Sequence, residues 1–149
     1  MNRETARAYR AILREELVPA MGCTEPIAVA FAAAKARQVL GTMPEKILIR
    51  CSANIIKNVK GVTVPNTGGL KGIDTAAIAG IVSDRADANL EVLAGLTEED
   101  IAEIRRLKER GFCVQELAEG IEGLYIEAWV WSGNKNARVI VEHTHTGIS

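Results

Sequence analysis

Hydrophobic and polar residues alternate with two different periods along this chain, and each period predicts a different kind of element. Residues 4–18 carry apolar side chains at helical spacing with charges between them, which predicts an amphipathic helix that Pro19 ends. Residues 27–40 are apolar almost throughout and very rich in alanine. Small side chains on several faces permit close approach, so this second helix is expected to be central, and Gly41 is expected to end it.

Two further helices are predicted in the middle of the chain. Residues 75–82 form a run of small apolar residues, with Asp74 as the expected N-cap and Gly80 inside the run. Glycine costs about 1 kcal/mol against alanine in a helix, so close packing is the expected reason for it. A charged helix is predicted over 97–110, with Thr97 as the N-cap and acids in its first turn.

Period-two alternation predicts the strands. A hairpin turn is expected at 133–136, because Gly-Asn-Lys-Asn separates two alternating runs. Together the elements predict a single α+β domain over 1–149, with a mainly antiparallel sheet of about four strands and small-residue-rich helices packed on it. The alternating segments are 45–52, 112–117, 124–131 and 137–145.

Composition narrows the class of protein. The 149 residues are 48% hydrophobic and 25% charged, with a net charge of −1 and only 4% aromatic residues. This profile is typical of a globular domain, and it argues against nucleic acid as a partner. No apolar run reaches the roughly 20 residues that span a bilayer, so no membrane partner is expected. Three cysteines and a charged N-terminus predict a cytoplasmic protein with reduced thiols.

Cys23 is the first candidate for chemistry. It lies in Met21–Pro26, between the two expected N-terminal helices, with Thr24 as a suitable N-cap. A helix N-terminus stabilises negative charge and lowers the pKa of a thiol, which favours metal ligation or nucleophilic attack. The alternative is a small buried residue in a tight turn, as free cysteine usually is.

The segment 53–72 is the second candidate, because it is polar and glycine-rich yet carries apolar anchors. Asn54, Lys57 and Asn58 supply donors, and the pair 68–69 lets main-chain N–H groups approach a small ligand. Lysine could neutralise a ligand carboxylate. The alternative is that Pro-Asn-Thr-Gly-Gly is only a turn signal.

Other potential metal ligands are weaker candidates. Cys51 shares the apolar face of its predicted strand, so it is expected in the core. His143 and His145 point to one face of the last predicted strand, but further ligands are not evident nearby.

The chain combines GCTEP at 22–26 with N-x-x-K-N at 54–58 and V-P-x-T-G at 64–68. With the residues around them, four separated stretches together resemble one family, the serine-dehydratase-alpha-like proteins that include L-cysteine desulfidases. The combination of GCTEP with N-x-x-K-N and V-P-x-T-G carries the resemblance, which extends over essentially the whole chain. Members of that family are oxygen-sensitive, iron–sulfur-dependent lyases that remove sulfide or water from a small amino acid, giving pyruvate and ammonia. The stretches are GCTEPIAVAFAAA (22–34), SANIIKNVKGVTVPNTGG (52–69), GIDTAAIAG (72–80) and ANLEVLAGLT (88–97).

The resemblance implies a cofactor and a set of site residues. Cys23 corresponds to a cysteine that ligates a four-iron, four-sulfur (4Fe-4S) cluster, whose open iron acts as a Lewis acid. It also implies that Lys57 and Asn58 are catalytic. The implied substrate-binding residues are Asn54, Thr67, Gly68 and Gly69.

Length is where the chain departs from that family. Members are longer, and their other cluster cysteines lie in a second half that this chain does not match. The chain is therefore expected to resemble the N-terminal portion of such a lyase, to need a C-terminal domain or partner subunit and a homo-oligomer, and to be inactive alone. The alternatives are a non-catalytic amino-acid-binding domain and an assembly domain that acts with a partner chain.

Overall fold

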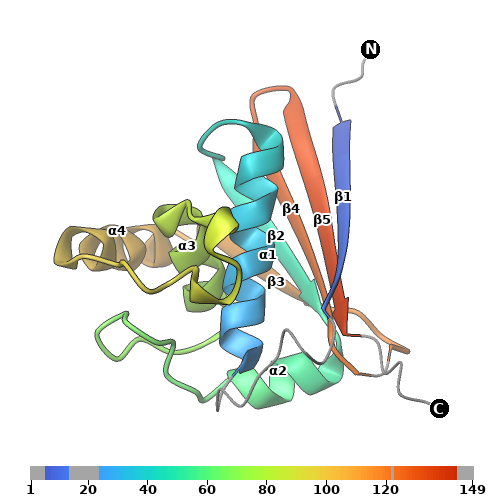
Figure 1. The fold of residues 1–149 in the computed structure, drawn as a ribbon, viewed down its shortest axis with the longest axis horizontal. Helices are drawn as coiled ribbons and strands as arrows, with labels where there is room; N and C mark the ends of the chain where they lie inside the picture. The colour runs from blue at the N-terminus through green and yellow to red at the C-terminus, as the bar shows by residue number, and fades with distance from the viewer. Residues whose placement is uncertain (1–5, 14–23, 122, 144–149) are drawn as a thin grey trace.

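The described residues of the computed structural model form a five-stranded sheet with helices packed on one side (Figure 1). The structure describes residues 6–13, 24–121 and 123–143. In chain order the elements are β1 (Ala6–Leu13), α1 (Thr24–Leu40), β2 (Lys46–Cys51), α2 (Ala53–Val59), α3 (Ile73–Ser83), the 3₁₀ helix η2 (Ala86–Glu91), α4 (Glu98–Glu109), β3 (Cys113–Leu117), β4 (Tyr125–Ser132) and β5 (Lys135–His143).

The predicted α+β class is confirmed. The strand order is β1-β5-β4-β2-β3. The centre of the sheet is antiparallel, because β4 pairs in that sense with both β2 and β5. The two edge strands pair in parallel, β3 with β2 and β1 with β5. All four predicted strands are present, and a fifth joins them.

The fifth strand corrects one prediction. Residues 4–18 were expected to form a helix, but β1 lies there and pairs with β5 from Ala6 opposite Asn136 to Leu13 opposite His143. Main-chain pairing with an existing strand outweighs a local helical spacing of apolar residues, because such spacing is only a weak preference until tertiary contacts form. Residues 14–18 lie outside the described part.

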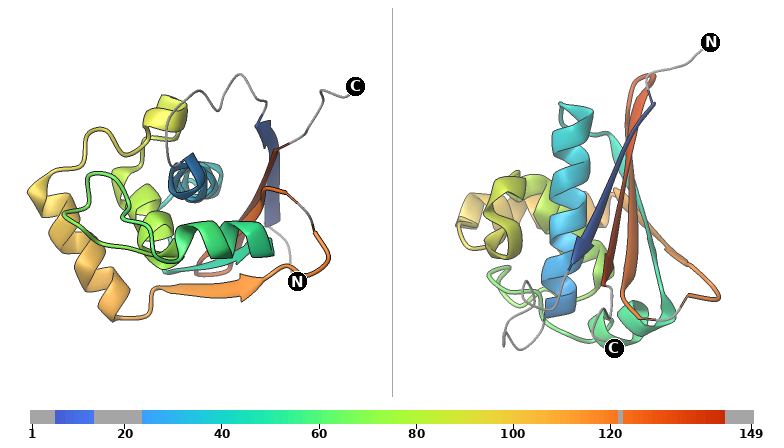
Figure 2. Two further views of the ribbon diagram at one scale, coloured as in Figure 1. Left: turned by 90° about the horizontal axis from the view of Figure 1, so that it is seen from below. Right: turned by 45° about the vertical axis from the view of Figure 1, so that its right-hand side comes forward.

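Helix α1 is the centre of the core, as its composition predicted. The sheet covers one side of it and α3 covers another (Figure 2). A helix that is apolar on every side is stable only when it is covered on every side. Its alanines at 30, 32, 33, 34 and 36 have no exposed surface. Gly41, at a φ of 90°, ends the helix as expected, and its N–H donates to the Arg37 carbonyl.

Helices α1 and α3 approach most closely at Gly80. A Cβ built on Gly80 would lie 2.0 Å from the carbonyl oxygen of Ala30 and 2.9 Å from its Cα. No side chain fits between the two backbones at this point. The close packing inferred from the glycine within a helical run is therefore confirmed.

The helix starts predicted at Thr97 and Asp74 came out differently. Thr97 caps α4 in a capping box, in which its hydroxyl accepts from Asp100 N and the Asp100 carboxylate accepts from Thr97 N. The N-cap of α3 is Gly72 rather than Asp74, at a φ of 102°. Asp74 lies in the first turn, where its carboxylate accepts from Thr75 N at 2.8 Å. A positive φ favours glycine, which explains the shift.

Replacing Gly80 by alanine tests the close approach. We expect Gly80→Ala to lower the free energy of unfolding by about 3 kcal/mol, since a main-chain oxygen cannot move aside and overpacking is costly. Gly61→Ala is the matched control, because a Cβ there meets nothing within 4 Å. Urea unfolding followed by circular dichroism measures both. Equal stability of the two variants would contradict the proposed packing constraint.

Candidate functional site

The segment between α2 and α3, residues 60–72, forms a closed loop that we call the glycine-rich loop. Val64 N donates to the Leu70 carbonyl at 2.8 Å, and Thr63 and Lys71 form an antiparallel bridge. The Thr67 hydroxyl is fully buried and donates to the Val64 carbonyl at 2.7 Å. These bonds close the loop on itself, so its conformation is set by its own main chain.

Contacts outside the loop hold it against the rest of the domain. Asn66 donates from Nδ2 to the Leu93 carbonyl at 3.0 Å. A Cβ on Gly68 would lie 3.7 Å from both Arg105 and Ile101, so this part of the loop lies against α4. A Cβ on Gly69 would meet nothing within 4 Å. The loop is therefore anchored at one point and open at the next.

The structure places the predicted site residues at one end of the molecule. Asn54, Lys57 and Asn58 lie exposed on α2, which leads directly into the glycine-rich loop (Figure 1). The N-terminal end of α1 lies at the same end. Gly68 and Gly69 are exposed, at φ values of 74° and 96°.

Two of the predicted residues differ from this group. Thr67 points into the loop rather than outward, and its hydroxyl proton is engaged by main-chain carbonyls. Cys23 lies outside the described residues, as does His145. The assigned roles of these residues stay predictions.

Positive charge surrounds the glycine-rich loop. Lys57, Lys60 and Lys71 are all exposed, and residues 52–73 contain no acidic side chain. Arg105 adds a fourth cation beside Gly68. Exposed charges of one sign with no counter-charge between them raise the local potential and attract anions.

Asp74, the first acidic residue after the loop in the sequence, is already paired. Lys108 Nζ lies 3.0 Å from both carboxylate oxygens of Asp74 and 2.9 Å from the Thr75 hydroxyl. It also donates to the Lys71 carbonyl at 3.3 Å. This cluster ties α4 to the start of α3 and offsets the negative charge of Asp74.

The surroundings of the two described cysteines make their thiols unreactive. Burial raises the pKa of the Cys51 thiol to about 12, and its side chain lies in the core as predicted. Burial is also the main cause that raises the pKa of Cys113, and the charge of Asp74 adds to it. Both thiols are protonated at neutral pH, whereas a metal ligand must be a thiolate.

The described residues include none of the cluster ligands that the resemblance implies, because Cys23 lies outside them. Among them, no group of three or more His, Cys, Asp or Glu side chains could hold a metal ion. The two cysteines that they include are protonated and separated from Cys23 in the sequence.

In the described part of the chain, no helix has the length and apolar character needed to cross a membrane.

A second group of residues, which the sequence analysis did not identify, lies on the other side of the sheet. Glu127 on β4 is 5% exposed, and its carboxylate accepts from Tyr125 Oη at 3.0 Å and from Trp129 Nε1 at 2.6 Å. Arg50 and Arg138 approach it from the neighbouring strands, at 3.6 and 3.8 Å. Two hydrogen bonds and two ion pairs thus hold a nearly buried carboxylate.

Aromatic side chains continue this group along β4. The rings of Trp129 and Trp131 stack with centroids 6.5 Å apart, and the Arg138 guanidinium lies 5.1 Å from the centre of the Trp129 ring. The sequence did carry a signal for this face. Tyr125, Glu127, Trp129 and Trp131 recur with period two, which places them on one side of the strand.

Together these features define an α+β domain with an electropositive glycine-rich loop at one end and a polar, aromatic sheet face. The sequence is similar to several proteins named UPF0597 protein. It is 51% identical over 138 residues to one from Lachnoclostridium phytofermentans, which covers 93% of this chain and 33% of that protein. It is 47% identical over 141 residues to one from Finegoldia magna, covering 94% and 34%. No protein-family model and no solved structure matches it.

These relatives correct the resemblance drawn from the four motifs. They carry the name UPF0597 protein rather than serine dehydratase or cysteine desulfidase, and that name indicates no lyase or iron–sulfur function. The predicted family, the predicted lyase activity and the predicted metal-binding class are therefore wrong. The chain spans about a third of the length of the curated relatives it matches.

The Glu127 group predicts a perturbed tyrosine. Burial raises the pKa of Tyr125 above its usual value of 10, and its hydrogen bond to Glu127 and the charge of that residue add to the shift. Tyr125 should therefore ionise later than an exposed tyrosine. Because the unfolded chain loses this proton first, the associated stability is complete below pH 10 and falls as the pH rises through the folded pKa.

Absorbance at 295 nm during an alkaline titration measures this shift, and subtracting the titration of Tyr125→Phe isolates Tyr125 from the other tyrosine. Glu127→Gln should lower the pKa of Tyr125 toward 10, whereas Glu119→Gln, at an exposed position, should leave it unchanged. An unchanged pKa in Glu127→Gln would show that the carboxylate does not cause the shift.

Proposed function

We propose that this domain binds a small ligand that carries a carboxylate, of the size of an amino acid, at the glycine-rich loop. The observation that carries the proposal is the closed, exposed loop with four cations around it and no acidic residue within the segment 52–73. The domain binds the ligand, and any activity belongs to a longer protein such as the relatives.

The geometry of the loop supports anion binding. Gly68 and Gly69 have positive φ values and are exposed, and Gly69 has open space beside it. Successive main-chain N–H groups in such turns form concave sites for anions. Thr67 fixes the loop from inside, so little conformational entropy would be lost when a ligand binds.

The charges support a carboxylate in particular. Lys57 lies in the last turn of α2, immediately before the loop, and Lys60 and Lys71 lie near the two ends of the loop. Arg105 presents a planar guanidinium beside Gly68. Two N–H donors of a guanidinium match the two oxygens of a carboxylate, and lysine ammonium groups add charge without demanding a fixed geometry.

An NMR titration with L-serine tests the proposal. We expect saturable shifts of the Gly68 and Gly69 amide signals in ¹⁵N-labelled protein. Lys57→Glu should weaken binding about tenfold, since it places an acid at the loop and reverses one charge. Binding should also weaken as salt rises, because the cations are exposed.

The controls separate a specific site from general charge. Lys135→Glu changes the net charge equally but lies beside the β4–β5 turn, at the opposite end of the sheet (Figure 1). It should leave the affinity unchanged. L-serine methyl ester, which lacks the carboxylate, should not bind. Shifts that do not saturate, or equal loss in both charge variants, would refute the proposal and favour a domain with no ligand at this loop.

A further inference from the structure

The side of the sheet turned away from the helices, which we call the outer face, has the character of a contact surface. All the described helices lie on the opposite side (Figure 2). Leu48 on β2 pairs in register with Trp129 on β4, and Lys46 with Trp131, so both tryptophans stand on the outer face. They are partly exposed. Tryptophan is enriched where one protein surface packs on another.

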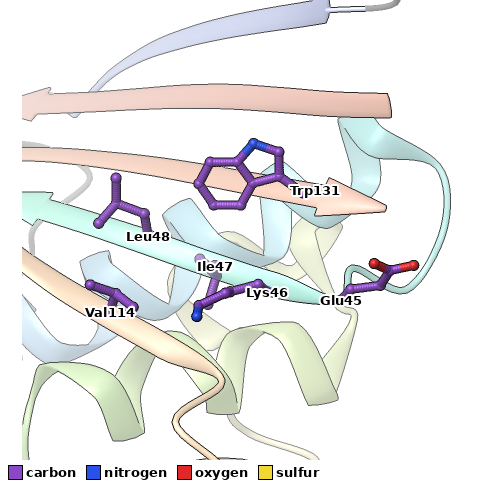
Figure 3. A pocket seen from close by; sticks show the side chains of 6 residues that line it. All are labelled: Glu45, Lys46, Ile47, Leu48, Val114 and Trp131. Carbon is purple, nitrogen blue, oxygen red and sulfur yellow. The ribbon is translucent and has the colours of Figure 1, made fainter. Parts of the chain in front are cut away.

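A hollow of about 350 Å³ opens on this face. Figure 3 shows Trp131, Leu48 and Val114 around it from three neighbouring strands, with the Lys46 side chain extending toward Val114 and Glu45 at one end. Its lining is mostly apolar, and Lys46 and Glu45 are its two charged residues. This arrangement fits an apolar side chain such as leucine or phenylalanine, with polar groups following at the rim.

The edge of the sheet beside the hollow is also open. In the described part of the chain, β3 pairs with β2 alone and stands at the end of the strand order. Val114 and Leu117 on it are 40% and 45% exposed. An uncovered edge strand with exposed apolar residues readily pairs with another chain, and natural proteins normally protect it.

The centre of the outer face can be covered by another protein segment without burying an unpaired charge. Glu127 has Arg50 and Arg138 as ion-pair partners and accepts hydrogen bonds from Tyr125 and Trp129. Arg50 also pairs with Glu116 at 3.3 Å. Burying an unpaired charge costs several kcal/mol, and Glu127, Arg50 and Arg138 avoid that cost because they are already paired within the domain.

The relatives indicate what covers the face. The match spans 33% of the Lachnoclostridium phytofermentans protein and 34% of the Finegoldia magna protein, so two-thirds of each polypeptide lies outside it. An aromatic face and an open edge on a domain of this size are the surfaces through which such a remainder would pack.

We propose that the outer face and the β3 edge form the interface with the part of the longer UPF0597-type polypeptide that this chain does not cover. The remainder inserts an apolar side chain into the hollow between Trp131, Leu48 and Val114. This interface is separate from the glycine-rich loop and does not depend on ligand binding there.

A chimera tests the proposal: this chain replaces the matching third of the Lachnoclostridium phytofermentans protein. We compare Val114→Lys in the chimera and in the isolated chain by thermal unfolding and limited proteolysis. Val114 is exposed in the isolated chain, so its melting temperature should change by less than about 1 °C, as for most surface substitutions. In the chimera the same change should separate this domain from the remainder and raise the rate of cleavage between them about tenfold or more.

Ala102→Lys, at an exposed position on α4, is the matched control and should have no effect in either protein. If the chimera does not fold, co-expression of this chain with the separate remainder gives the same comparison, with loss of co-purification in Val114→Lys as the expected result. Equal effects in both proteins, or co-purification that survives Val114→Lys, would overturn the proposal. An isolated chain that is a dimer broken by Val114→Lys would assign the face to a second copy instead. L-serine titration of Val114→Lys separates the two proposals, because the glycine-rich loop should still bind.

Discussion

The contact between the backbones of α1 and α3 is the constraint on which the rest of the structure depends. At Gly80 no side chain fits between α3 and the carbonyl of Ala30. Because the two helix backbones are this close, small residues such as alanine fill the space between α1 and α3. The sheet covers another side of α1. The start of the same helix α3 holds the end of the glycine-rich loop through the bond from the Thr75 hydroxyl to the Lys71 carbonyl at 2.7 Å.

The two faces of the sheet are stabilised in different ways. The inner face is packed with aliphatic side chains that have almost no exposed surface, so burial of apolar area stabilises it. The outer face is organised around Glu127, whose carboxylate is satisfied by two hydrogen bonds and two arginines. A buried carboxylate is tolerated only when every partner is in place. The domain therefore presents one surface built by packing and one built by paired polar groups.

Local patterns were enough to anticipate much of this arrangement. The alanine-rich run, the capping box of Thr97 and the alternating strands each have a short-range cause, and each prediction was confirmed. Part of the candidate site could be predicted from the sequence for the same reason, since Asn54, Lys57 and the glycine pair belong to one continuous segment. Arg105 could not be predicted as part of the site, because it comes from α4 and lies beside the loop only in the folded chain.

The sequence by itself determined the α+β class, the central helix and the cationic, acid-free character of the segment before α3, because these follow from composition and spacing over a few residues. The tertiary structure decided the rest. It made 6–13 a strand, since pairing with β5 outweighs a local helical pattern. It buried the Thr67 hydroxyl inside the loop, and it gathered Arg50, Glu127 and Arg138 from three strands onto one face. Contacts between distant segments form only when the chain folds, and no local pattern specifies them.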